Sequence, residues 1–227
     1  GQEEFRKLEE GDKENKRLWQ WFRRESLREF SGIYRRLGVK FDIILGESFY
    51  EKDLKPLIEK LVRRGIAKES EGSLIVPLEK ENLAPALIRK SDGASLYLTR
   101  ELANLEYRIK KYKPKKILYV VGNEQSLHFE QLFAIAKILG FRGPELHHVK
   151  FGLVLGPDRQ KFSTREGHTV ALEELIEKLV KLAYGVVMKK NPKLKAKDKK
   201  IIAEAVGLGA LKYNDLREHR HSDIILD

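Results

Sequence analysis

The stretch KILYVVGNEQSLHFEQLFAIAKILG, residues 116–140, decides the fold of this chain. Its first six residues form a nearly continuous apolar run, which predicts a strand over residues 116–121 that is buried on both faces, as in a parallel sheet. Gly122 ends that strand, and apolar residues then recur at helical spacing over residues 125–139, up to Gly140. A strand followed directly by a helix is the unit from which parallel α/β sheets are built.

The same alternation continues on both sides of this stretch. Periodicity predicts further strands and helices: strands over residues 86–90 and 146–149, and helices over residues 99–112, 171–188 and 201–217. A basic connector over residues 191–200 precedes the last helix, which contains Gly207 and Gly209. Parallel strands joined through helices require right-handed crossovers. The predicted fold class is therefore α/β, with a Rossmann-like parallel sheet.

The first 85 residues follow a different plan. Apolar residues at three- and four-residue steps predict helix over residues 3–37, broken at Gly11 and Asp12 and ended by Gly38. Shorter elements follow: a strand over residues 41–45, a turn over 46–48, a helix over 52–64, and a hairpin of residues 66–68 with 73–76. We therefore predict a helical and small β connecting insertion, residues 1–85, and a Rossmann-type domain, residues 86–227.

Composition limits the possible functions. The chain has 227 residues, with 45 Lys and Arg against 34 Asp and Glu, and a formal net charge of +11. Such an excess attracts polyanions such as tRNA or ATP, although an ordinary basic domain explains the count equally well. Without cysteine the chain forms no disulfide or thiolate metal site, and no metal site is predicted. No apolar run approaches the roughly 20 residues of a membrane span, so we expect a cytoplasmic protein with no membrane partner.

The segment SDGASLYLTRELANLEYRI, residues 91–109, holds the first candidate site residues. Thr99 is a plausible helix N-cap, and Tyr97 and Glu101 lie four residues apart, on one side of a strand-to-helix junction. A carboxylate and an aromatic ring that face a cleft can hold a cationic ligand. An exposed Glu beside a half-buried Tyr explains the same residues, and for this segment alone that interpretation is favoured.

Two further segments carry polar residues at the same predicted edge. Gln125 and His128 follow the carboxyl end of the strand over residues 116–121, where ligands of open α/β sheets bind, although a capping Gln and a satisfied His explain them equally well. The loop over residues 156–167 is glycine-rich and basic. It can close over a triphosphate, but it lacks the Walker pattern, and taken alone it fits an ordinary surface loop.

In this order, SDGASLYLTRELA, YVVGNEQSLHFEQ and HVKFGLVLGPDRQKFSTREG resemble the second half of the nucleotide-binding domain of arginyl-tRNA synthetases, which are class I aminoacyl-tRNA synthetases. Residues 5–50 are similar to the segment that joins the two halves of that catalytic core. Residues 207–227 are similar to the stretch that closes it. The resemblance covers essentially the whole chain and is most specific in its middle third.

The resemblance implies an arginine–tRNA ligase, which activates arginine with ATP to arginyl-adenylate and transfers the arginyl group to tRNA-Arg. It implies arginine, ATP and tRNA-Arg as partners, with Mg²⁺ accompanying ATP. By motif position, the implied site residues are Tyr97, Glu101, Gln125 and His128 for arginine; Gln131, His148, Phe151, Gly152, Leu153, Val154 and Phe162 for ATP; and Lys161, Ser163, Thr164 and Arg165 for catalysis.

The chain departs from the family pattern in three ways. The family usually has Asp at the position of Glu101, and one extra methylene shifts a pocket by about 1 Å. Thr164 stands where most class I enzymes carry a catalytic lysine. The His-rich HIGH motif is absent, so we expect the first half of the fold to precede Gln2 and the anticodon-binding domain to follow Asp227. The chain is then a partial catalytic domain, inactive or weakly active alone, with the missing N-terminal half as a partner.

Two alternatives remain at this point. The chain could be a catalytically inactive synthetase-like module that binds RNA or a protein partner through its positive charge. It could also serve another class I specificity. The lack of zinc ligands argues against cysteine as the substrate, and an acidic residue in the pocket argues against glutamate.

Overall fold

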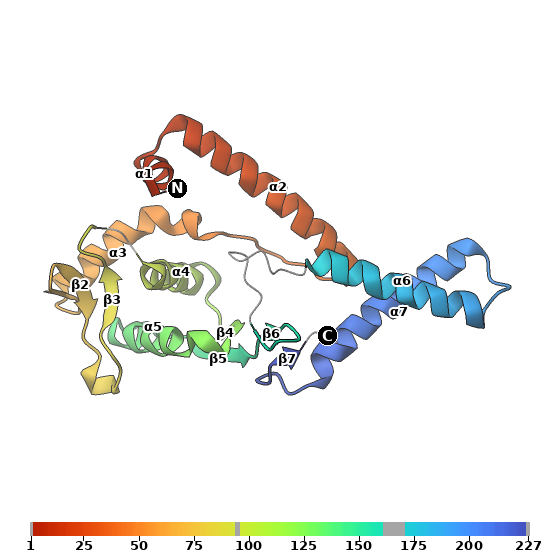
Figure 1. Ribbon diagram of the computed structural model, residues 1–227. Coiled ribbons are helices and arrows are strands. Elements are labelled where there is room, and N and C mark those ends of the chain that lie inside the picture. Colours follow the sequence, from red (N-terminus) through yellow and green to blue (C-terminus); the bar gives the residue numbers. More distant parts are fainter. Residues whose placement is uncertain (1, 94–95, 161–170, 226–227) are drawn as a thin grey trace. The chain divides into compact units, whose positions relative to one another are not determined.

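The computed structural model describes residues 2–93, 96–160 and 171–225 (Figure 1). The chain forms two compact units: residues 1–44 with 170–213, and residues 45–169 with 214–227. These units do not follow the boundary at residue 85, and the division into residues 1–85 and 86–227 stays a prediction. Within the described ranges, each helix is too short or too polar to cross a lipid bilayer.

The first unit is helical. It holds α1 (Gln2–Glu10), α2 (Lys13–Leu37), α6 (Leu172–Lys190) and most of α7 (Ala196–Arg217). The predicted break after α1 is confirmed: Gly11 has a φ of 95°, and the Asp12 carboxylate accepts hydrogen bonds from the backbone of Glu14 and Asn15 as the N-cap of α2. Gly38 ends α2 in the left-handed conformation, as predicted.

Helices α6 and α7 cross at a glycine (Figure 1). A Cβ at Gly207 would lie 2.8 Å from the backbone nitrogen of Val180, so the two backbones approach as closely as a missing side chain allows. The Arg36 guanidinium joins α2 to both helices, through Glu177 at 2.7 Å and Glu204 at 2.9 Å. The connector predicted over residues 191–200 is too long, because α7 begins at Ala196 and the buried Lys199 amine donates to the Pro192 carbonyl across the turn.

The second unit combines helices with three small sheets. Its elements are η1 (Glu47–Tyr50), α3 (Glu51–Arg63), β1 (Lys68–Ser70), β2 (Ser73–Val76), η2 (Glu79–Glu81), β3 (Ala86–Arg89), α4 (Tyr97–Tyr112), β4 (Lys116–Gly122), η3 (Asn123–Gln125), α5 (Ser126–Ile138), β5 (Glu145–Phe151), β6 (Val154–Leu155) and β7 (Ile224–Ile225). The predicted helices over residues 52–64 and 125–139 and the hairpin before residue 77 are confirmed, with the first hairpin strand two residues later than predicted.

The parallel sheet is confirmed in a reduced form. Strands β4 and β5 pair in parallel from Lys116 opposite Glu145 to Gly122 opposite Phe151, and β6 pairs in parallel with β7. The strand at residues 86–89 pairs instead with β2, in an antiparallel sheet of order β1-β2-β3. The unit from β4 through α5 to β5 is the crossover that the opening stretch predicts.

One hydrophobic core runs through this unit. Each element contributes an apolar stripe: Leu54, Leu57 and Leu61 from α3; Leu74, Val76 and Ile88 from the antiparallel sheet; Leu102 and Leu105 from α4; Ile117 and Tyr119 from β4; and Phe129, Leu132 and Ile135 from α5. Their burial at roughly 25 cal/mol per Å² is the main stabilising term. It also holds the starts of α4 and α5 near one end of β4.

The prediction that β4 is buried on both faces is wrong. Burial alternates along the strand: Ile117 and Tyr119 are buried, whereas Leu118 and Val120 are 56% and 64% exposed. Successive side chains of a strand point to opposite faces. Among the described residues, helices cover only the face of Ile117 and Tyr119, so the apolar run encodes one core face and one uncovered face.

Three local predictions are also wrong. Residues 41–45 form no strand, because they pair with no neighbouring strand in the described chain and expose Phe41, Ile43 and Ile44. The predicted turn over residues 46–48 is the short helix η1. Thr99 is not an N-cap: it is the third residue of α4, and its buried hydroxyl donates to the Ile88 carbonyl at 2.5 Å, which ties α4 to β3.

The crossing of α6 and α7 predicts opposite effects at two neighbouring glycines. Gly207→Ala should lower the free energy of unfolding by about 1–3 kcal/mol, because its methyl group must push the Val180 backbone away. Gly209→Ala is the matched control: nothing lies within 4 Å of its added Cβ, so the variant should gain about 0.5–1 kcal/mol from helix propensity. Urea denaturation measures both values. Equal effects at the two positions would contradict the close crossing.

Candidate functional site

The starts of two helices meet at the carboxyl end of β4. Tyr97 is the first residue of α4, and His128 lies in the first turn of α5, which follows β4 through η3. Their rings lie 4.7 Å apart between centroids, with 32° between the ring planes. The structure thus brings together two of the predicted arginine-site residues, at the sheet edge where open α/β folds bind their ligands.

Glu101 lies one helical turn after Tyr97 and is partly buried. Burial raises the pKa of Glu101 above its ordinary value, and the positive charge of Arg108 and the amide of Asn104 act in the opposite direction. Burial also raises the pKa of Tyr97, and the negative charge of Glu101 adds to that shift. The carboxylate therefore lies in a poorly solvated region beside Tyr97.

An aromatic wall lies behind this pair. Phe129 contacts the rings of His128, His148 and Tyr119, at centroid distances of 5.0, 4.5 and 4.9 Å. Burial, followed by the nearby His148, lowers the pKa of His128, which favours the neutral ring near pH 7. The His148 Nε2 lies 3.0 Å from the Val121 carbonyl, so this nitrogen carries the proton and donates it.

Four buried side-chain atoms in the described chain have no hydrogen-bond partner: Asn104 Oδ1, Tyr119 OH, His128 Nε2 and His148 Nδ1. All four belong to α4, β4, α5 and β5, the elements around Glu101. Burial of an unpaired polar atom costs roughly 1–3 kcal/mol. The four atoms therefore lower the stability of the fold in one region. Such places are candidates for ligand binding.

The predicted glutamines lie at this edge in different environments. Gln125 is the half-buried residue immediately before α5. The Gln131 amide donates to the Ala84 carbonyl at 3.0 Å, so it helps to hold α5 against the segment that precedes β3. Gln131 therefore has a structural contact in addition to its predicted role at the nucleotide.

A second wall of the edge forms where β5 meets the end of the chain. The backbone of Gly152 donates to the Arg220 carbonyl, Leu153 donates to the Asp223 carboxylate at 2.7 Å, and Ile224 donates back to Leu153. Together with Phe151, Val154 and residues of the 215–224 segment, they line a mainly apolar cavity of about 470 Å³. Four residues predicted for the nucleotide, Phe151 to Val154, thus line one cavity.

The remaining site predictions have no structural description. Lys161, Phe162, Ser163, Thr164 and Arg165 lie outside the described residues. In the other direction, sequence reasoning missed Asn104, Arg108 and Tyr119, which surround Glu101. Asn104 and Arg108 follow Glu101 by three and seven residues, the spacing of one helix face, and that spacing could have found them.

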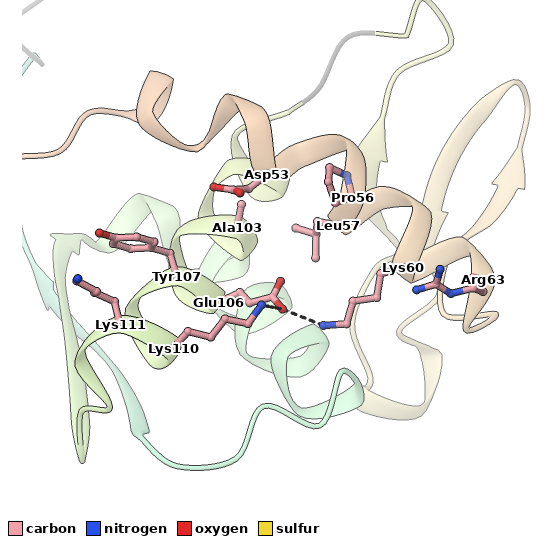
Figure 2. Close-up of a pocket in the computed structure, with 10 residues that line it drawn as sticks. All are labelled: Asp53, Pro56, Leu57, Lys60, Arg63, Ala103, Glu106, Tyr107, Lys110 and Lys111. Carbon is pink, nitrogen blue, oxygen red and sulfur yellow. Dashed lines mark hydrogen bonds and ion pairs between the residues drawn. The ribbon is translucent and has the colours of Figure 1, made fainter.

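A separate groove of about 590 Å³ lies between α3 and α4 (Figure 2). Figure 2 shows Lys60 of α3 and Lys110 of α4 pointing at one carboxylate, Glu106. The amines lie 3.0 and 2.9 Å from its oxygen, and the Glu106 side chain is only 19% exposed. Because the central cations of the groove already have a partner, we interpret the network as a link between two helices.

Comparison with known proteins identifies relatives of the whole chain. A family model described as class I tRNA synthetases (R), catalytic domain, matches residues 1–227. An arginine–tRNA ligase of Ligilactobacillus salivarius is 47% identical over 95% of this chain, which covers 38% of that protein. One from Bacillus thuringiensis is 48% identical over 97% of this chain and is covered to 39%. The chain thus spans about two fifths of the length of the curated relatives that it matches.

Solved structures agree on the fold. The crystal structure of an arginyl-tRNA synthetase from Plasmodium falciparum has a TM-score of 0.82 and 26% sequence identity, and the match covers 99% of this chain and 38% of the other. A synthetase of the same type from Thermus thermophilus has a TM-score of 0.71 at 18% identity, over 97% of this chain and 45% of the other. These similarities support the α/β fold and the predicted parallel sheet.

The network in the α3–α4 groove predicts a pH-dependent loss of stability. Burial acts to raise the pKa of Glu106, but the hydrogen bonds from Lys110 and Lys60 outweigh it and hold the pKa below its ordinary value. A lowered carboxyl pKa stabilises the fold above the unfolded value of 4.5 and ceases to do so as the pH falls through the folded value. Glu106→Gln should therefore cost about 1–2 kcal/mol at neutral pH, and the difference should shrink in acid.

Denaturation of both proteins across the acidic range measures this difference. Glu59→Gln on the neighbouring helix is the control, because Glu59 is exposed and has no ion pair among the described residues. A cost at Glu106 that stays constant down to about pH 3 would show that charge is not its cause.

Gly152 should tolerate no side chain. A Cβ there would lie 2.2 Å from the Ser222 carbonyl oxygen, and backbone atoms cannot rotate away. Gly152→Ala should therefore separate the 219–224 segment from β6, with a loss of about 1–3 kcal/mol. Hydrogen exchange at the Ile224 amide reports the change, because that amide donates to Leu153. Gly46→Ala is the control, since Gly46 is extended and nothing lies within 4 Å of its added Cβ. Unchanged protection at Ile224 would refute the prediction.

Proposed function

The chain belongs to the class I tRNA synthetases for arginine, and from that membership we propose that the full-length protein is an arginine–tRNA ligase. In the proposed reaction, a carboxylate oxygen of arginine attacks the α-phosphorus of ATP, and the bond to the bridging oxygen breaks, so that pyrophosphate leaves. A ribose hydroxyl at the end of tRNA-Arg then attacks the arginyl carbonyl and AMP leaves. This activity gives arginine, ATP and tRNA-Arg as partners and the cytoplasm as the place of action.

Glu101 is the proposed partner of the substrate guanidinium. A carboxylate accepts two parallel hydrogen bonds from a guanidinium, and burial strengthens their electrostatic component. Tyr97 and His128 supply a ring pair beside the carboxylate, 4.7 Å apart, which suits a flat cation. We assign Gln125, immediately before α5, to the polar rim of the same pocket.

The cavity at the end of β5 is the proposed place of the adenosine. Its apolar lining from Phe151 and Val154 suits a base. His148 does not line this cavity but packs against Phe129, so its assignment to the nucleotide rests on motif position alone. Gln131, whose amide donates to the Ala84 carbonyl, is likewise assigned to the nucleotide by motif position alone. We propose that Mg²⁺ accompanies the triphosphate and lowers its charge. Lys161 and Arg165 would offset charge on the leaving pyrophosphate, with Phe162, Ser163 and Thr164 in the same loop.

One observation supports the arginine assignment most directly. Glu101 is a partly buried carboxylate that has no ion pair within 4 Å among the described residues, at a sheet edge suited to ligands. A charge in that position is costly unless a cation joins it. An incoming guanidinium would pair with the carboxylate and remove that cost. Recognition of the substrate would therefore depend on the positive charge of its side chain.

Removal of this charge should weaken arginine binding selectively. In the full-length protein, Glu101→Gln should raise the KM for arginine by roughly 30- to 5,000-fold, corresponding to about 2–5 kcal/mol for the loss of one partner of a buried charge pair. The KM for ATP should change little. Glu101→Asp keeps the charge and should retain most of the activity. Arginine-dependent ATP–pyrophosphate exchange measures these values.

Glu130→Gln is the control, because Glu130 is exposed on α5 and is not assigned to the site. A wild-type KM for arginine in Glu101→Gln would refute the assignment of Glu101. Absence of exchange in the wild-type full-length protein, together with retained RNA binding, would instead favour the non-catalytic module.

A further inference from the structure

Helix α4 carries a polar stripe beside the leucines that it contributes to the core. Tyr97, Glu101, Asn104 and Arg108 recur at steps of four, three and four residues, which places them on one face. The interleaved Leu98, Leu102 and Leu105 are buried in the core. Asn104 itself is only 6% exposed, so the polar stripe extends into the interior. Burial of polar side chains in such a stripe lowers the stability of the fold, so we infer that the stripe serves a function other than packing.

Arg108 is the cation of this stripe. Helical side chains tilt toward the N-terminus, so Arg108 reaches back toward Glu101, two turns earlier. Its guanidinium carbon lies 5.6 Å from the centroid of the Tyr119 ring on β4, a cation–π distance. In the described part of the chain, no carboxylate lies within 4 Å of this guanidinium. Arg108 is thus held by a ring near Glu101, without a direct ion pair.

The charges around Glu101 leave Arg108 as its counter-charge. The groups that interact with the carboxylate are Arg108, Asn104 and Tyr97 on α4, Glu47 and Tyr50 on η1, and Tyr119 on β4. Glu47 opposes ionisation, and the nearby Arg100 faces Glu47 and Glu51 at 3.9 and 3.6 Å. Burial raises the pKa of Glu101, and Arg108 is the largest influence that lowers it.

We propose that Arg108 is a positioning residue that keeps Glu101 ionised in the ligand-free site without forming a contact ion pair that arginine would have to break. A direct ion pair would satisfy Glu101 and compete with the substrate guanidinium. A cation held further away by the Tyr119 ring stabilises the negative charge and leaves the carboxylate free for a second cation. This inference rests on the proposed role of Glu101 in arginine binding.

The pH dependence of arginine binding tests the proposal. Without Arg108, Glu101 should titrate at higher pH, because burial then acts with less opposition. In full-length Arg108→Gln, the midpoint at which the KM for arginine begins to rise on acidification should move up by about one pH unit. Below that midpoint the KM should rise by about tenfold per pH unit, while kcat at saturating arginine stays near wild type. Arg108→Lys keeps the positive charge and should bring the midpoint most of the way back to the wild-type value.

Arg64→Gln provides a matched control. The Arg64 guanidinium donates to the Leu139 carbonyl at 2.8 Å in the same compact unit, so this variant loses a structural arginine and should leave the midpoint unchanged. A KM for Arg108→Gln that rises equally at every pH, or a midpoint equal to that of wild type, would overturn the proposal.

Carbon-13 NMR of the ligand-free protein separates this proposal from the function of the site. With labelled glutamate, the carboxyl resonance of Glu101 should titrate at higher pH in Arg108→Gln than in wild type, whatever the substrate is. If the NMR midpoint moves but Glu101→Gln does not affect the KM for arginine, the charge coupling stands and the arginine assignment fails. If Glu101→Gln raises the KM but the NMR midpoint is unmoved by Arg108→Gln, the inference on Arg108 fails alone.

Discussion

The parallel ladder between β4 and β5 governs where the described candidate residues at the sheet edge lie. Its register places Gly122 opposite Phe151, so both strands end at one edge, and α5 has to begin there to make the crossover. Packing of α4 and α5 on Ile117 and Tyr119 then holds the first turns of both helices at that edge. Tyr97, His128 and His148 are distant in the sequence, and this register is what brings them to one wall of the site.

The same packing removes polar and charged side chains of α4 from water, at a cost in electrostatic free energy. Leu102 and Leu105 have to be buried, and the helix period then buries Asn104 and partly buries Glu101 and Arg108 beside them. Burial raises the pKa of Tyr119 to about 12 and leaves its hydroxyl without a partner. A fold selected only for stability would place apolar side chains here. Buried polar groups of this kind are typical of a ligand-binding site, where the ligand supplies the missing partners.

Close backbone approach at Gly152 supplies the other wall. The segment around residues 219–224 follows β5 by nearly seventy residues, yet it exchanges backbone hydrogen bonds with Gly152 and Leu153. Only a residue without a Cβ allows the Ser222 carbonyl to come so near. Gly207 serves the crossing of α6 and α7 in the same way. In both places, a glycine lets segments distant in the sequence come into backbone contact.

Local patterns in the sequence were sufficient for the helix boundaries at Gly38 and Gly140, the hairpin at Gly72 and the β4–α5–β5 unit, because each depends on periodicity or turn chemistry. They were also sufficient for the family, because it is recognised from contiguous motifs. They could not show that Leu118 and Val120 face away from the core, that residues 41–45 lack a partner strand, or that the Thr99 hydroxyl bonds Ile88, since these depend on which distant segment lies alongside. For the same reason, Glu101 could be proposed from its motif and Arg108 could have been found from its helical spacing, but the contact of Arg108 with the Tyr119 ring became visible only when α4 was packed on β4. A single chain records its local preferences directly, whereas burial and electrostatic coupling arise between segments brought together by folding.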